Sequence, residues 1–227
     1  MFHHFFGRTA IPPTLLATGS IAGELPDADI DRTTTITVPA GTNRLIVVNV
    51  SLRNSAGESV ASVVSNVGGA LTLKTSVEAS ATEARAELWY LIGPSTGVHV
   101  ITVTFSADVR SIVSSHCYRN VHQSVPFGTA ATASELAGST GETATVDATS
   151  AVGELVIDVL ARVDIDAITA GAGQTEMVNT VTTDEIASLN IRAGVSREDG
   201  AATVTMSWAL AGGLHSWALL AIGLKPS

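Results

Sequence analysis

The chain has 227 residues, with 12 Lys and Arg against 21 Asp and Glu and a formal net charge of −9. An acidic chain whose basic residues are scattered is a poor ligand for nucleic acid, because phosphate binding needs clustered Lys and Arg. Cys117 has no second cysteine to pair with, which excludes an internal disulfide. No apolar run reaches the roughly 18 residues that a membrane span needs. We therefore expect neither nucleic acid nor a membrane as a partner.

Residues 1–32 differ from the rest and are predicted to form an extended arm. Phe2, Phe5 and Phe6 are three of the five phenylalanines in the chain. Exposed aromatic clusters are costly in water, so we expect them to be covered by the chain's own core or by a neighbouring subunit. Both alternatives stay open, and the three Phe are the candidate partner-binding residues. The start of the chain lacks the basic and apolar regions of an export signal, which favours release by lysis.

From residue 33 the alternation of apolar and polar residues predicts strands separated by Gly and Pro turns. In the first half these strands lie near residues 34–38, 45–52, 60–64, 71–77, 85–92, 101–105 and 112–118. The run Leu45–Leu52 is apolar on both faces, which predicts a strand that is buried on both sides. Residues 93–97 (Gly-Pro-Ser-Thr-Gly) supply the turn between two strands of a hairpin.

The second half, about residues 142–226, echoes the first, about residues 33–125. Thr203-Val-Thr-Met-Ser matches Thr102-Val-Thr-Phe-Ser, and the matched segments are offset by 101 to 110 residues. A short helical turn is expected at 134–137 in the connection, and the apolar run from His215 to Leu224 predicts a central strand. Two like halves fit two sheets of one sandwich or two small sandwiches. The connection lacks linker composition, which favours one sandwich.

About a dozen strands at this spacing predict an all-β fold. We expect an antiparallel β-sandwich of jelly-roll or Greek-key type over residues 33–227, preceded by the extended arm. The three tryptophans, Trp89, Trp208 and Trp217, are expected to contribute most to the buried apolar area. The charged neighbours Arg85 and Glu87 leave Trp89 open to a contact between sheets or subunits.

Three alternating aspartates, Asp27, Asp29 and Asp31, are the candidate metal site. Hard cations such as Ca²⁺ bind several carboxylate oxygens at one point. The glycine and the distant Glu of a calcium loop are missing, so a solvated acidic loop is the favoured interpretation. Asp164 and Asp166 form a weaker version of the same pattern. No metal or other cofactor is expected.

Zinc and catalytic sites are not favoured by the sequence either. His116 and Cys117 are neighbours in a predicted strand and should point to opposite faces, so they cannot easily share a metal with His122. A nucleophile elbow, a phosphate loop and a dinucleotide fingerprint are all missing from the sequence. We therefore do not expect an enzyme.

The order of the motifs resembles a jelly-roll-like β-sandwich domain that recurs in tailed-phage virion proteins and in bacterial surface or secreted proteins of unassigned role. The resemblance covers about residues 33–226, and the arm lies outside it. The matching pieces are turns and core positions: Val38-Pro-Ala-Gly41, Gly68-Gly-Ala-Leu-Thr72, Leu88-Trp-Tyr-Leu91, Asn120-Val-His-Gln-Ser-Val-Pro126, Gly173-Gln-Thr175 and Ser216–Pro226. The resemblance implies a fold and brings no catalytic residues.

The resemblance, the long sandwich, the missing export signal and the apolar arm together favour a structural protein of a phage virion. We expect an accessory capsid protein of the decoration or cement type that contacts the major capsid protein. A homo-oligomer is expected, either a trimer or a subunit placed at a symmetry axis. It would be assembled in the host cytoplasm and released with particles. The alternatives are a tail or fibre component and an extracellular carbohydrate-binding module.

Overall fold

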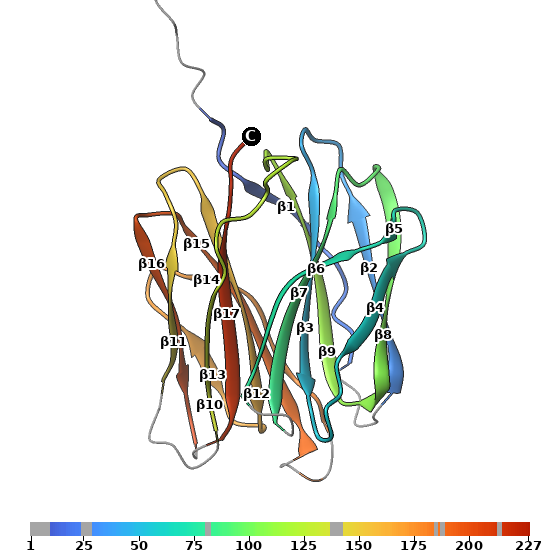
Figure 1. Cartoon of the computed structure of the whole chain (residues 1–227), viewed down its shortest axis with the longest axis vertical. Helices are drawn as coiled ribbons and strands as arrows, with labels where there is room; N and C mark the ends of the chain where they lie inside the picture. The colour runs from blue at the N-terminus through green and yellow to red at the C-terminus, as the bar shows by residue number, and fades with distance from the viewer. Residues whose placement is uncertain are drawn as a thin grey trace, which may run out of the picture.

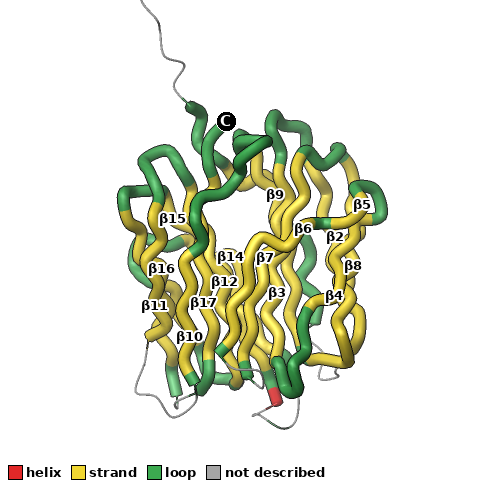
Figure 2. Tube along the Cα trace, viewed as in Figure 1, coloured by secondary structure: helices red, strands yellow, loops and turns green. Residues whose placement is uncertain are grey.

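The computed structural model describes residues 10–23, 29–79, 83–136, 143–183, 186, 189–212 and 215–227. Strands make up most of this part of the chain, which confirms the all-β prediction (Figure 1). Figure 2 shows these strands in yellow. No helix in these residues is long and apolar enough to cross a membrane. The strands of the first half are β1 (Thr14–Thr18), β2 (Asp29–Val38), β3 (Leu45–Arg53), β4 (Val60–Ser65), β5 (Gly69–Ala70), β6 (Thr72–Glu78), β7 (Ala84–Ile92), β8 (Gly97–Val109) and β9 (Ser111–Arg119). Those of the second half are β10 (Ala131–Glu135), β11 (Thr143–Thr149), β12 (Leu155–Val163), β13 (Ile168–Ala170), β14 (Thr175–Val181), β15 (Ile191–Asp199), β16 (Thr203–Leu210) and β17 (Trp217–Leu224).

Four antiparallel sheets form four layers. Outer sheet 1 has the order β2-β8-β4-β5, and inner sheet 1 has the order β1-β9-β3-β7-β6. Inner sheet 2 is β10-β17-β12-β15-β14, and outer sheet 2 is β11-β16-β13. From right to left in Figure 1 the layers run from outer sheet 1 to outer sheet 2. The antiparallel sandwich is therefore confirmed, but each half builds its own pair of sheets where one shared pair was favoured. The hairpin expected across residues 93–97 is wrong, because this turn leads from β7 in inner sheet 1 to β8 in outer sheet 1, and the two strands do not pair.

The two halves have the same topology. The order β1-β9-β3-β7-β6 becomes β10-β17-β12-β15-β14 when each strand is replaced by its counterpart in the second half. The order β2-β8-β4 becomes β11-β16-β13 in the same way. The echo in the sequence thus corresponds to two copies of one strand arrangement, packed against each other through their inner sheets.

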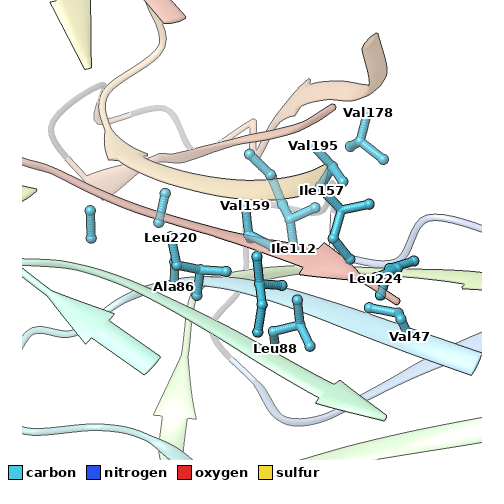
Figure 3. Close-up of a cluster of buried hydrophobic side chains, with 14 of the residues drawn as sticks. Val47, Ala86, Leu88, Ile112, Ile157, Val159, Val178, Val195, Leu220 and Leu224 are labelled. Carbon is cyan, nitrogen blue, oxygen red and sulfur yellow. The ribbon is translucent and has the colours of Figure 1, made fainter. Parts of the chain in front are cut away.

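Three apolar cores lie between the four layers. The central core joins the inner sheets and includes Val47 and Leu88 from the first half with Ile157, Val159 and Leu220 from the second (Figure 3). The two outer cores lie within the halves. Strands β3, β12 and β17 face a core on each side, and all but the last residue of β3 is buried. The apolar runs at 45–52 and 217–224 follow directly from this arrangement.

The described part of the arm belongs to the body of the protein. β1 pairs with β9 from Thr14 opposite Arg119 to Thr18 opposite His116, and Leu15 and Leu16 pack against two cores. β2 already begins at Asp29, so the body starts earlier than the expected boundary at residue 32. Phe2, Phe5 and Phe6 lie outside the described residues.

β10 takes the place of β1 in the second half and corrects one local prediction. The helical turn expected at 134–137 is a strand as far as Glu135, and Ala131–Glu135 pairs with β17 along its whole length. Alanine favours a helix in isolation, but Ala131 and Ala133 pack on the outer core of the second half. Tertiary pairing has therefore overridden the intrinsic propensity.

Candidate functional site

The solvent side of outer sheet 1 is a surface of Thr, Ser and Val side chains, named here the Thr/Val face. It follows from the alternation of β2, β8 and β4, whose other side chains enter the core. The residues of the Thr/Val face are Thr33, Thr35, Thr37, Ser62, Val64, Val98, Val100, Thr102 and Thr104. Asp31 lies on the same side of β2, opposite Thr104, and is the charged residue at one end of this face.

The register of the strands brings these residues into cross-strand rows. Thr33 lies opposite Thr102, which in turn lies opposite Val64, and Thr37 lies opposite Val98. Val98 is 53% exposed and Val64 is 42% exposed, so apolar surface is presented to solvent among the hydroxyl groups. The opposite end of the molecule, outer sheet 2, also carries threonine rows, where Asp147 accepts a hydrogen bond from Thr205. Among the described residues of β11, β13 and β16 there is no exposed large apolar side chain. The Thr/Val face is the more apolar of the two outer faces.

The candidate calcium residues are only partly brought together. Asp27 lies outside the described residues. Asp29 and Asp31 line a hollow of about 410 Å³, and Arg32 lines it with them. Arg32 Nη1 lies 2.9 Å from Asp29 Oδ2. One carboxylate of the expected set is thus already paired with a guanidinium, which weakens the case for a cation there.

His116 and Cys117 lie on opposite faces of β9, as their spacing predicts. Cys117 faces the outer core of the first half. Tyr118 faces the central core, and His116 lies two residues before it on the same side of β9. Burial lowers the pKa of His116 to about 4 and raises the pKa of Cys117 to about 11. His122 accepts hydrogen bonds at Nδ1 from the backbone of Ser124 and Val125. Each of the three side chains therefore has a separate structural setting.

One group of possible metal ligands was not predicted from the sequence as a set. Asp164, Asp166 and His215 have ligand atoms within 4.8 Å of one another. The aspartates follow β12, and His215 precedes β17. Arg162 Nη2 lies 2.6 Å from Asp164 Oδ2, and His215 Nε2 lies 3.6 Å from the same oxygen. The backbone N–H of Asp166 donates to Asp164 Oδ1 at 2.7 Å.

The charges of this cluster are already balanced by arginines. Arg192 donates to the carbonyl of Ile165 at 2.6 Å, so two guanidinium groups accompany the two aspartates. Burial raises the pKa of Asp164, and the charge of Arg162 opposes that rise. A divalent cation would compete with the buried Arg162 for the same carboxylate oxygen. We interpret the cluster as an ion-pair network that joins two loops.

The network is a feature of the second half. β3 and β12 each have nine residues, and Leu52 and Asn54 hold the places of Arg162 and Asp164. In the first half, Asn54 caps its own loop by accepting from the backbone N–H of Gly57 at 2.7 Å. The two halves therefore close equivalent loops by different chemistry.

Asp158 is a fully buried carboxylate in β12. It accepts from the backbone N–H of Ser196 at 2.6 Å and from Trp208 Nε1 at 2.8 Å, and the Ser196 hydroxyl and Gln174 amide also contact it. Burial raises the pKa of Asp158 to about 7, and these donors oppose the rise. The carboxylate orients Trp208 in the outer core of the second half.

The raised pKa of Asp158 predicts a pH dependence of stability. The folded state holds the proton up to about pH 7, whereas the unfolded chain releases it near the ordinary value of 3.8. Stability from this group is therefore complete below the ordinary value and is lost as the pH rises through about 7. In urea titrations, the free energy of unfolding of the wild type should fall by a few kcal/mol relative to that of Asp158→Asn as the pH rises from 3.8 to about 7. The reason is that the asparagine side chain does not titrate in this range. A constant difference between wild type and variant at all pH values would contradict the assignment.

No protein-family model matches this chain, and a search of curated proteins gives no match.

Proposed function

We propose that this protein is a structural subunit of a tailed-phage particle, and that it acts as an accessory capsid protein of the decoration or cement type. The Thr/Val face is the observation that carries the proposal. Charged residues are depleted at the centre of protein interfaces, because their desolvation is costly. A broad sheet face that combines exposed Val64 and Val98 with neutral hydroxyl groups meets this condition.

The architecture supports the same function. Two sandwiches that share a central core form a rigid body, so little conformational entropy is lost when one face docks. A stable interface of standard size buries about 1,600 Å² in total. We propose the major capsid protein as the partner, with a homo-oligomer, such as a trimer at a symmetry axis, as the attached form. Phe2, Phe5 and Phe6 would add apolar contacts to this attachment.

The alternative classes differ in what they require. A tail or fibre component would use the same kind of contacts. Whether the protein binds the capsid or the tail of the particle distinguishes these two classes. A carbohydrate-binding module based on aromatic platforms is less well supported. Trp208 and Trp217 are 0% and 6% exposed, and Trp89 packs against an outer core while its Nε1 donates to Glu87 at 2.9 Å.

The proposal is tested by co-sedimentation of the purified protein with phage particles that lack it. Val98→Asp places a charge at the most exposed valine of the Thr/Val face and should weaken particle binding about tenfold or more, because that charge must be desolvated. Val125→Asp is a matched control, since Val125 is 52% exposed and lies in the connection between the halves. Surface changes of this kind should alter stability by no more than about 0.5 kcal/mol.

Equal binding of wild type, Val98→Asp and Val125→Asp would show that the Thr/Val face is not the docking surface. Failure of the wild-type protein to sediment with any particle would contradict the function itself.

A further inference from the structure

A cluster of three polar side chains lies in the second half, where β12 and β15 meet the turn before β14. Its members are Asp158, Ser196 and Gln174, which hydrogen bonds join to one another. Asp158 and Ser196 are both 0% exposed. Gln174 is only partly buried and follows the turn at residues 171–173, so it forms the solvent side of the cluster.

The first half has apolar side chains at the three equivalent positions. In the order Asp158, Ser196 and Gln174, the strand registers give Val48, Trp89 and Leu71 as the counterparts. All three pack in or against the outer core of the first half. The strand arrangement therefore does not require polar groups at these positions. Because burial of a carboxylate is costly, their presence favours a chemical role.

The side-chain amide of Gln174 is held at both ends. Its Oε1 accepts from the backbone N–H of Ser207 at 2.8 Å, and the Ser207 hydroxyl lies 3.5 Å from the same oxygen. Its Nε2 lies 2.6 Å from Ser196 Oγ and 3.3 Å from Asp158 Oδ2. A Cβ at Gly171 would lie 2.6 Å from Gln174 Oε1, so glycine leaves room for the amide. Donors at the carbonyl oxygen stabilise the negative charge that develops there when the carbonyl carbon is attacked.

Ser196 has the position of a nucleophile. Its hydroxyl donates to Asp158 Oδ1 at 2.9 Å, so the carboxylate can take its proton. Cδ of Gln174 is bonded to Nε2 at about 1.33 Å and therefore lies within about 4 Å of Ser196 Oγ. A rotation about the Cγ–Cδ bond of Gln174, which is a soft torsion, turns the face of this carbon toward the oxygen. The nucleophile, its base, the oxyanion donors and the leaving nitrogen thus belong to one cluster.

We propose that Ser196 and Gln174 form an intramolecular ester bond, which links β15 to the residue before β14. Ser196 Oγ attacks Cδ of Gln174 while its proton passes to Asp158, and the oxygen that gains negative charge faces Ser207. Asp158 then gives the proton to Nε2, the Cδ–Nε2 bond breaks, and ammonia leaves on the solvent side. One Cδ–Oγ bond replaces one Cδ–Nε2 bond, and the hydroxyl proton leaves with the ammonia, so no cofactor, oxidant or water is consumed.

The setting of the carboxylate suits both proton transfers. Burial raises the pKa of Asp158 to about 7, so the group can accept and return a proton near neutral pH. The fold holds the hydroxyl and the amide next to each other, which gives the reaction a high effective concentration. The bond would fasten β14, a strand at the edge of inner sheet 2, to its neighbour β15. This inference does not depend on the proposed particle function.

Mass spectrometry of the purified full chain tests the proposal. The wild type should be lighter than its sequence by one ammonia molecule. Trypsin cleaves after Arg162, Arg192 and Arg197 and so separates Gln174 from Ser196. Residues 163–192 and 193–197 should nevertheless be recovered as one joined species. Alkaline hydroxylamine should split this species, because it cleaves an ester and leaves an amide intact.

Three variants assign the bond to its residues. Ser196→Ala should have the full mass and give two separate peptides, and Asp158→Asn should remain largely unlinked because it lacks the proton acceptor. Ser114→Ala changes another buried serine, in β9, and should keep the bond as the matched control. Circular dichroism melts check that each variant is folded.

A wild-type chain that gives two separate peptides would overturn the proposal, whatever the behaviour of the variants. A joined species that persists in folded Ser196→Ala, or that resists hydroxylamine, would overturn it as well. If the ester is found and the protein does not bind particles, the bond stands while the proposed particle function fails.

Discussion

Replacement of Trp208 by alanine should lower the free energy of unfolding by roughly 3–5 kcal/mol, the range for removal of a buried aromatic side chain. Trp208 is 0% exposed and belongs to the outer core of the second half. Gly194 makes room for it, since a Cβ there would lie 2.9 Å from Trp208 Cζ2. The substitution also removes one of the donors that hold the buried Asp158. Both effects act in the same direction, and urea unfolding followed by circular dichroism measures their sum.

Trp89→Ala is the matched control for this loss. Trp89 is only half-buried. When its indole is removed, the Glu87 carboxylate still has Arg85 as a partner, since Arg85 Nε lies 2.7 Å from Glu87 Oε1. The cost of this change should therefore be smaller than that of Trp208→Ala. Equal losses in the two variants would show that Asp158 and its surroundings add nothing specific to the core of the second half.

Separation of the two halves should have the other large effect. A cut at Ser124–Val125 leaves one fragment with β1–β9 and the other with β10–β17. Each fragment would expose its side of the central core, which includes Val47 and Leu88 in one and Val159 and Leu220 in the other. Apolar patches of this size are not stable in water, so each fragment alone should aggregate or pair with itself. When the two fragments are expressed together, they should form a soluble complex of native size.

Light scattering of the separate and co-expressed fragments provides the measurement. Two soluble, folded and monomeric fragments would show that the halves are independent domains and that the central core contributes little. The choice of a cut at this connection avoids both inner sheets, so failure of a fragment to fold cannot be attributed to a broken strand.

The strands and their faces could be predicted from the sequence because period-2 alternation records one buried face. The runs at 45–52 and 217–224 were correctly placed as strands buried on both sides, and this was the available signal for inner layers. One sandwich was favoured because the connection between the halves lacks linker composition, whereas the structure has four sheets, two from each half. Alternation shows that a face is buried, but it does not show which sheet covers that face.

The sites were harder to predict because they combine residues that are distant in the chain. Asp164 and His215 are brought together by loops at the ends of β12 and β17, which pair with each other. The Thr/Val face could have been found from the residues Thr33, Thr35 and Thr37, whose spacing places three hydroxyl groups on one side of β2.

The most direct test of the proposed particle function is quantitative mass spectrometry of phage particles purified from a lysate of cells in which this protein is produced. If the protein is an accessory capsid subunit, its peptides should be found in the particles at a fixed ratio to the major capsid protein. Their absence from purified particles, with the protein remaining in the particle-free lysate, would contradict the proposal.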